Sequence, residues 1–267
     1  MAPSDYKNFK AKNAVVTGAA DGIGRGVALR LAADGLNVVV NDLPSKQQQL
    51  DSLVKEIQGK GVKGVAYVGD VTDKAVNEAI VATCVEKFGS LDVMVCNAGT
   101  AFIKSIADTP YEEVESLINI NFKSMWHGYN TAAKQMIKQD KGGRIIGAAS
   151  SVAKKGYPMM GAYSSSKFCV RGLTQSASQE WGQFGITVNS YCPGVIWTPL
   201  IQSLGNDLQS VLGQSGESPK EMWAKACALK RVGEPEDIAG VVSWFASKDS
   251  GYVTGQNINV DGGGLFD

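Results

Sequence analysis

The sequence contains a single histidine, His127, and its 26 Lys and Arg residues are balanced by 26 Asp and Glu residues. One histidine excludes metal sites that need two or three imidazoles, so we expect no metal, and it limits catalytic triads to His127 itself. A net charge of zero leaves no surplus for a nucleic-acid backbone or an anionic membrane, so we expect neither partner. Acid–base chemistry is therefore expected to use another side chain.

Disulfides and long apolar runs are also missing. The five cysteines are odd in number, scattered, and form no C-x-x-C pair, which fits a reducing compartment. The segment 1–13 is polar and does not predict a signal peptide, and no run reaches the ~18–20 apolar residues that cross a bilayer. With 44% hydrophobic residues the chain can bury a large core. We therefore expect a soluble, cytoplasmic protein.

Short β-branched runs alternate with longer segments of helical period. Strands are predicted at 14–17, 38–41, 64–68, 91–96, 144–149, 187–192 and 256–260. Helices are predicted at 23–33, 46–58, 74–88, 111–139, 162–184 and 235–247, with a broken helical segment at 203–230. This alternation predicts an α/β fold in which residues 1–267 form a single doubly wound, Rossmann-type domain. Its seven-stranded parallel sheet would carry helices on both faces and bind ligands beyond the carboxyl ends of its strands.

A glycine-rich turn follows the first predicted strand. It contains Gly18, Asp21, Gly22, Ile23 and Gly24. Glycine lets a backbone turn tightly and approach a pyrophosphate, whose charge the N–H groups of a helix N-terminus then meet. The turn predicts a dinucleotide-binding site, and the alternative is a tight strand–helix turn with no ligand.

Asp42 and Leu43 follow the second predicted strand. A carboxylate at this place accepts hydrogen bonds from the adenosine ribose and repels a 2′-phosphate. No Arg or Lys is expected to face that phosphate position, and Asp21 occupies the nearby loop. The sequence therefore favours NAD over NADP, with a solvated loop acid as the alternative for Asp42.

The later strands end in further candidate ligand-binding residues. These are Asp70 and Val71, then Asn97, Ala98 and Gly99, then Ser150 and Ser151, and finally Pro193, Gly194, Ile196 and Thr198. An aspartate such as Asp70 also commonly caps the following helix, so its signal alone is weak.

Tyr163 and Lys167 are four residues apart and share one face of a predicted helix. A phenol has a pKa near ~10, and a nearby ammonium together with an oxidised nicotinamide stabilises the phenolate and lowers that pKa. Tyr163 would then take the proton of an alcohol, or donate one to a ketone, while a serine holds the substrate oxygen. A half-buried tyrosine beside a solvated lysine is the alternative.

The motifs TGAADGIG (17–24), NAG (97–99), YSSSK (163–167), PG (193–194) and VTGQNINVDGG (253–263) resemble those of the short-chain dehydrogenases/reductases over nearly the whole chain. The segment from YSSSK to PG is similar to acetoin/diacetyl reductases and meso-2,3-butanediol dehydrogenases of that family. The resemblance implies that Tyr163 is the acid/base, that Lys167 binds the nicotinamide ribose, and that Asn121 holds the water of a proton relay. It also implies a homotetramer with the helices near 111–139 and 162–184 at the interface.

The substrate-orienting serine is ambiguous. Ser150 lies 13 residues before Tyr163, the spacing usual in the family, whereas Ser151 is the match when the second serine of the pair is aligned. The sequence-based choice is Ser151, which requires a one-residue deletion in the following loop.

Three functions stay open. The first is an NAD-dependent dehydrogenase for small hydroxyketones such as acetoin, and the second is one for bulkier secondary alcohols (terpenoid, sterol or polyol). A lid at about 198–230, with Trp197 and Trp223, would allow the second, although ordinary core packing is the alternative for these aromatics. The third is a non-catalytic dinucleotide sensor, against which the Tyr163, Lys167 and Asn121 set argues.

Overall fold

The computed structural model describes residues 9–212 and 218–266. Within them, seven parallel strands form one sheet in the order β3-β2-β1-β4-β5-β6-β7. The strands are β1 (Asn13–Thr17), β2 (Asn37–Asp42), β3 (Gly64–Val68), β4 (Val93–Cys96), β5 (Gly143–Ala148), β6 (Ile186–Pro193) and β7 (Asn257–Val260). The order reverses between β1 and β4, and open sheets of this kind bind ligands at such a switch point.

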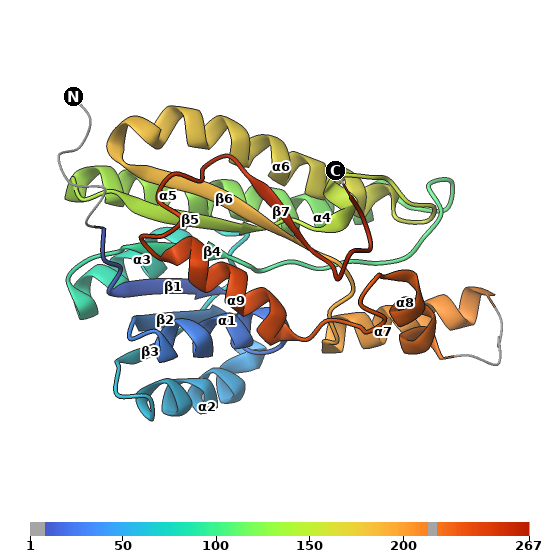
Figure 1. Cartoon of the computed structure of the whole chain (residues 1–267), viewed down its shortest axis with the longest axis horizontal. Helices are drawn as coiled ribbons and strands as arrows, with labels where there is room; N and C mark the ends of the chain where they lie inside the picture. The colour runs from blue at the N-terminus through green and yellow to red at the C-terminus, as the bar shows by residue number, and fades with distance from the viewer. Residues whose placement is uncertain (1–8, 213–217, 267) are drawn as a thin grey trace.

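Helices cover both faces of the sheet, as Figure 1 shows. On one face α1 packs against α2 and α9, and on the other α5 packs against α3 and α6. The bounds are α1 (Gly22–Ala33), α2 (Gln47–Gln58), α3 (Lys74–Phe88), α4 (Tyr111–Ile118), α5 (Ser124–Gln139), α6 (Gly161–Trp181), α7 (Pro199–Leu212), α8 (Pro219–Ala226) and α9 (Pro235–Ala246). The predicted single doubly wound domain is confirmed.

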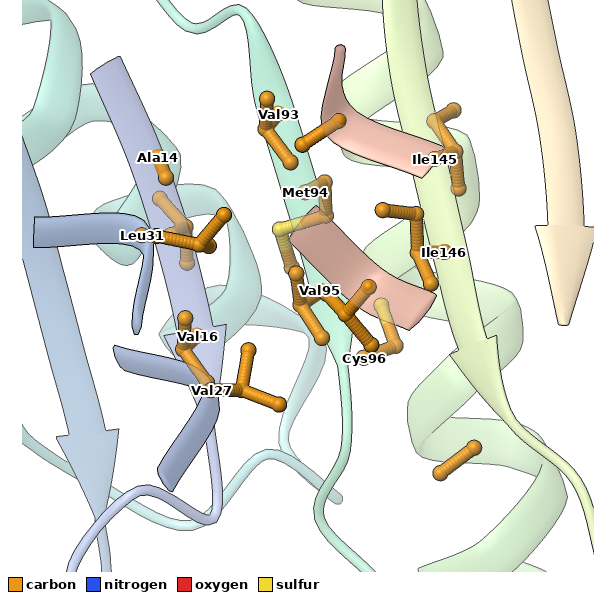
Figure 2. Packing of buried hydrophobic residues seen from close by; sticks show 14 of the residues in the cluster. Ala14, Val16, Val27, Leu31, Val93, Met94, Val95, Cys96, Ile145 and Ile146 are labelled. Atoms are coloured by element: carbon orange, nitrogen blue, oxygen red, sulfur yellow. The ribbon is translucent and has the colours of Figure 1, made fainter. Parts of the chain in front are cut away.

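The core lies between the sheet and these helices. Val27 and Leu31 are four residues apart on α1, so they share the face that lies against β1 and β4 (Figure 2). Both are fully buried, as are Val16 and Val95 on the strands. Burying a side chain of this size stabilises the fold by about 1.5–3 kcal/mol. The central strands are therefore a rigid support for the residues that follow them.

Two predicted helices differ in detail from the structure. The segment 111–139 is interrupted by a π-helical turn, η3 (Asn119–Lys123), between α4 and α5. The segment 203–230 is two helices, α7 and α8, beyond one end of the sheet (Figure 1). Ser218 caps α8 by accepting a hydrogen bond from Glu221 N. Residues 213–217 of the expected lid lie outside the described residues. No helix in the described ranges is long and apolar enough to cross a membrane.

Candidate active site

The glycine-rich turn after β1 packs against the end of β4. Gly18 has a φ of +61°, and a Cβ on it would lie 2.7 Å from Ala98 Cα. A Cβ on Gly24 would overlap the carbonyl oxygen of Gly18. Asn97 Nδ2 donates to the carbonyls of Thr17 and Gly18 at 3.0 and 2.9 Å, so β4 holds the turn in place. The absent side chains leave the N-terminus of α1 open to a pyrophosphate group.

The carboxylate of Asp42 is fixed by two backbone N–H groups at the end of β2. Its Oδ2 accepts from Ala20 N at 2.9 Å, and its Oδ1 accepts from Leu43 N at 2.8 Å. The Asp42 carboxylate is therefore held against the glycine-rich turn, beside the N-terminus of α1. Each carboxylate oxygen retains a lone pair with which to accept a ribose hydroxyl.

Lys46 contradicts the expectation that no Lys or Arg faces this part of the site. It ends a short 3₁₀ turn, η2 (Pro44–Lys46), and its Nζ lies 3.0 Å from Asp21 Oδ2. The hydrogen bond and charge of Asp21, with a smaller contribution from Asp42, raise the pKa of Lys46. The pairing was missed because Asp21 lies 25 residues earlier in the chain, so only the turn of η2 brings the two together.

Tyr163 and Lys167 lie one turn apart on α6 and face the end of β5. Lys167 is buried, its Nζ lies 5.7 Å from the centre of the Tyr163 ring, and it donates to the Ala148 carbonyl at 2.8 Å. The side chains of Ser150 and Tyr163 are hydrogen-bonded to each other. Ser150 Oγ also accepts from Val152 N at 3.4 Å, which holds the hydroxyl in position. A phenol, a hydroxyl and an amine therefore converge at one point.

A cavity of about 590 Å³ connects the glycine-rich turn to this point. Most of the residues predicted from sequence line it: Gly18, Asp21, Gly22, Ile23, Gly24, Asp42, Leu43, Asp70, Val71, Asn97, Ala98, Gly99, Ser151, Tyr163, Lys167, Pro193, Gly194, Ile196 and Thr198. Sequence reasoning missed Lys46, Thr100 and Tyr191, which also line it. Among the described residues, no three His, Cys, Asp or Glu side chains are grouped as metal ligands.

Comparisons with known proteins agree with this geometry. Residues 18–264 match the family model described as enoyl-(acyl carrier protein) reductase. A short-chain dehydrogenase/reductase of Armillaria gallica is 44% identical over 95% of this chain and 96% of its own length. The L-2,3-butanediol dehydrogenase of Corynebacterium glutamicum is 42% identical over 96% and 99%. The chain belongs to the short-chain dehydrogenase/reductase family. In structure, actinorhodin polyketide ketoreductase with NADPH covers 100% of both chains at 30% identity, with a TM-score of 0.90.

Short-chain dehydrogenases/reductases bind a nicotinamide dinucleotide, and the residues of this chain fit one. The fit is shown by the glycine cradle that a Cβ would fill at Gly18 and by the carboxylate of Asp42 fixed beside it. Asp70 behaves mainly as a turn former, since its Oδ1 accepts from Thr72 N at 2.9 Å, and Asp73 caps α3. Its place in the cavity wall still allows contact with the adenine end.

Burial dominates the pKa values of Tyr163 and Lys167. Burial raises the pKa of Tyr163, and the hydrogen bond from Ser150 lowers it by less. Burial also lowers the pKa of Lys167 to about 8. Lys167 alone therefore does not bring the phenol to neutral pH, because both groups are removed from water. The lower pKa of Tyr163 predicted from the sequence combines Lys167 with the positive charge of an oxidised nicotinamide, and it stays a prediction.

The serine that contacts Tyr163 is Ser150, whereas the sequence-based choice was Ser151. Ser151 begins a short 3₁₀ turn, η4 (Ser151–Ala153), and lines the cavity wall next to Ser150. The spacing of 13 residues that favoured Ser150 needs no deletion in the loop. The hydrogen bond between Ser150 and Tyr163 supports Ser150 as the substrate-orienting serine, and the choice between Ser150 and Ser151 stays a prediction.

Asn121 lies in the π turn η3 and is fully buried. Its Oδ1 accepts from Thr100 N at 2.8 Å, and its Nδ2 donates to Thr100 O at 2.9 Å and to Ser166 Oγ at 3.0 Å. The side-chain amide thus joins the loop after β4 to α6, which carries Lys167. Asn121 is outside the cavity wall and supports it from behind.

Proposed function

We propose that this short-chain dehydrogenase/reductase is an NAD-dependent oxidoreductase that interconverts a secondary alcohol and a ketone. The observation that carries the proposal is the convergence of Tyr163, Ser150 and Lys167 at one end of the cavity whose other end holds Asp42. A single pocket then holds both a dinucleotide and a proton-transfer group.

A nicotinamide dinucleotide, held by the glycine-rich turn and Asp42, would supply the acceptor or donor of the hydride that the alcohol carbon loses or the ketone carbon gains. Tyr163 takes the alcohol proton in the first direction and donates it in the second. Ser150 donates a hydrogen bond to the substrate oxygen, which orients the reacting carbon. Lys167, an ammonium below pH about 8, stabilises the phenolate form of Tyr163 and binds the nicotinamide ribose.

Asn121 acts as a positioning residue in this proposal. Both N–H groups of its side-chain amide are used by Thr100 and Ser166. The water of a relay from Lys167 is therefore held by backbone groups of the π turn, and the Asn121 side chain fixes that turn.

Replacing Tyr163 tests the function directly. Tyr163→Phe retains the ring and removes the proton-transfer group, so we expect NADH formation from acetoin and from cyclic secondary alcohols to fall by at least ~10²-fold. NADH binding, followed by fluorescence, should change less than threefold. If no alcohol in a broad panel gives NADH with the unmodified protein, the proposed enzymatic function is refuted and the non-catalytic sensor is favoured.

Asp42 supports NAD rather than NADP as the cofactor. A 2′-phosphate at about 4 Å from its carboxylate would be repelled by ~1–4 kcal/mol per unit charge, or ~5- to 1,000-fold in affinity. Lys46 offers little compensation because Asp21 already holds its ammonium at 3.0 Å. Asp42→Asn should reduce the preference for NAD, measured as the dissociation constant of NADP divided by that of NAD, at least tenfold. An unchanged preference would contradict the argument that Asp42 accepts the ribose hydroxyls and repels a 2′-phosphate. Lys46→Gln is the control, and it should change the affinity for NAD less than threefold.

Two substrate classes are candidates for this reaction. The butanediol dehydrogenase name of a 42%-identical relative supports a small vicinal hydroxyketone such as acetoin or diacetyl, the class favoured from sequence. A bulkier secondary alcohol is favoured by a second cavity next to the active site. A kinetic panel of acetoin, diacetyl, cyclic alcohols and terpenols with both cofactors separates them.

A homotetramer in the cytoplasm remains part of the proposal. Its support is the exposure of aromatic side chains on the helices expected at the interface, with Tyr111 of α4 70%, Trp126 of α5 51% and Phe168 of α6 44% exposed. Covering such surfaces between copies removes apolar area from water. Light scattering should give a mass near four times 28.2 kDa.

A further inference from the structure

A second cavity of about 610 Å³ adjoins the cofactor cavity on the side away from Asp42. The two cavities share walls at the ends of β5 and β6: Ser151, Val152, Met160, Gly194, Val195 and Ile196. The second cavity is closed by α8, by the segment 227–233 that leads to α9, and by the C-terminal segment 259–265. A substrate whose oxygen meets Ser150 and Tyr163 can therefore extend past these shared residues into the second cavity.

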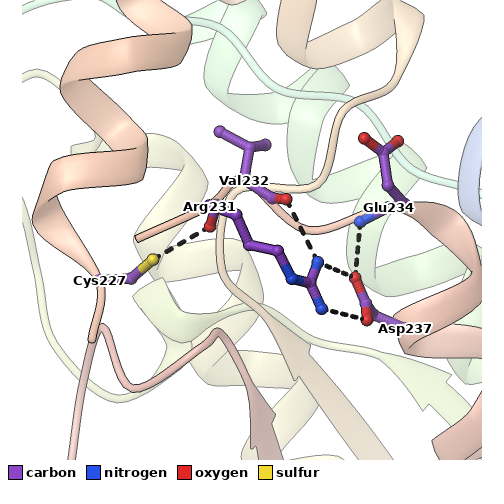
Figure 3. Close-up of polar contacts among 5 residues, drawn as sticks. All are labelled: Cys227, Arg231, Val232, Glu234 and Asp237. Atoms are coloured by element: carbon purple, nitrogen blue, oxygen red, sulfur yellow. Dashed lines mark hydrogen bonds and ion pairs between the residues drawn. The ribbon is translucent and has the colours of Figure 1, made fainter. Parts of the chain in front are cut away.

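The far wall of the second cavity is largely apolar. It includes Trp223 from α8, Cys227, Val232 and Val260, with Leu229 at 64% exposure near the opening. A thiol behaves as a small apolar group in such a wall, and Cys227 Sγ is directed to the Arg231 carbonyl at 3.1 Å (Figure 3). These side chains suit a hydrocarbon surface.

The charged side chains of this wall are engaged by the protein. Arg231 forms two parallel hydrogen bonds with Asp237, of 2.6 and 2.7 Å, and Asp237 also accepts from Glu234 N at 2.8 Å (Figure 3). The carboxylate of Asp261 accepts from the N–H groups of Gly263 and Leu265 at 3.0 and 2.9 Å. Among the described residues that line this cavity, the one cationic side chain, Arg231, is paired with Asp237, so the wall does not favour a phosphate or carboxylate on the occupant.

The volume excludes a four-carbon substrate as the molecule that fills this space. Acetoin has six non-hydrogen atoms, which at about 30 Å³ each, the share of a water molecule in the liquid, occupy at most ~180 Å³. A well-filled ligand pocket of this size class holds a much larger molecule. Acetoin would leave most of the 610 Å³ to water against apolar walls.

We propose that the preferred substrate is a secondary alcohol or ketone with a neutral hydrocarbon body, a ring system or chain of roughly ten to fifteen carbon atoms, seated between Trp223, Cys227 and Val260. This inference rests on the proposed function. The body needs no further hydroxyl groups, because the side chains that enclose it are apolar. Small hydroxyketones are still converted, with lower kcat/KM.

The test compares 2-alkanols from four to ten carbons, and a bicyclic secondary alcohol, with acetoin in the NAD⁺-dependent reaction. Each added methylene should raise kcat/KM up to about three- to fourfold, so 2-decanol should exceed 2-butanol by more than ~100-fold. An acetoin kcat/KM equal to or above that of 2-decanol and the bicyclic alcohol overturns the inference and leaves the proposed function standing. Turnover of none of these compounds overturns the proposed function itself.

Substitutions that fill the second cavity test whether the hydrocarbon body of the substrate is seated there. Cys227→Phe should raise the KM for 2-decanol at least tenfold and change the kcat/KM for acetoin less than threefold. Leu229→Trp, at the partly exposed opening, should act in the same direction and does not require a buried residue to be enlarged. Met222→Phe is the matched control on α8, since Met222 is exposed and outside the cavity wall. Equal effects of Cys227→Phe and Leu229→Trp on both substrates would place the hydrocarbon body elsewhere and overturn the inference.

Discussion

Lys167 should destabilise the folded protein at neutral pH, and its removal should therefore increase stability while it abolishes function. The lysine is 3% exposed, and burial lowers its pKa from 10.5 to about 8. At ~1.4 kcal/mol per pH unit, this difference corresponds to about 3 kcal/mol of lost stability. Lys167→Met retains the length of the side chain but gives up the hydrogen bond to the Ala148 carbonyl, a loss of about 1 kcal/mol. The net expectation is a gain of about 2 kcal/mol at pH 7.

The pH dependence of this gain in stability shows whether the buried charge of Lys167 causes it. Between pH 8 and 10.5 the unfolded state binds more protons at this lysine than the folded state, so the stability of the unmodified protein rises with pH through that interval. Below pH 8 the penalty is fully present. The advantage of Lys167→Met should therefore be constant from pH 6 to 7.5 and shrink by about 3 kcal/mol as the pH approaches 10.5.

Urea unfolding of both proteins without cofactor, at pH steps from 6 to 10.5, measures this difference. Lys134→Met, on the exposed surface of α5, is the control and should change the unfolding free energy by less than about 0.5 kcal/mol at every pH. A difference between Lys167→Met and the unmodified protein that does not vary with pH would refute the reasoning, since a packing effect has no titration.

Two further outcomes follow from the site. Ser150→Ala should lower kcat at least ~100-fold and Ser151→Ala less than tenfold, as measured by steady-state NADH formation; the reverse order would restore Ser151 as the orienting serine. Gly24→Ala places a methyl group against the Gly18 carbonyl and should cost about 1–3 kcal/mol of stability and at least tenfold in NADH affinity by fluorescence titration. Gly240→Ala, on α9, is its control because an added Cβ there meets no atom within 4 Å, and an equally small effect at both glycines would contradict the close packing of the turn.

The fold could be predicted from the sequence because its determinants are local. Runs such as Val38–Val40 are buried on both sides, and each is followed by a segment of helical period, so hydrophobic pattern alone identifies a covered parallel sheet. The glycine-rich turn and the Tyr163–Lys167 spacing are also local patterns. Each of these predictions depends on residues fewer than about ten positions apart.

The parts of the site that could not be predicted depend on distant contacts. Lys46 reaches Asp21 only because a short turn brings it back toward the end of β1. Tyr191 Oη donates to Asn97 Oδ1 at 2.8 Å across 94 residues, and nothing in either local sequence marks that pair. The balance between burial and charge at Tyr163 likewise depends on how many groups surround the phenol, which a linear pattern does not contain.

The π turn at 119–123 makes the number of residues between α4 and α5 as important as their identity. A π turn accommodates one residue more than an α-helix of the same length. Deleting a residue such as Ile120 would remove the extra residue and allow a continuous α-helix, in which the flanking turns keep their faces but the side chains inside the turn change direction. The buried face of α5 would remain in place, but Asn121 would lose its hydrogen bonds with Thr100 and Ser166. Chain length in this segment is therefore a determinant of the active site, and substitutions here should be better tolerated than single-residue deletions.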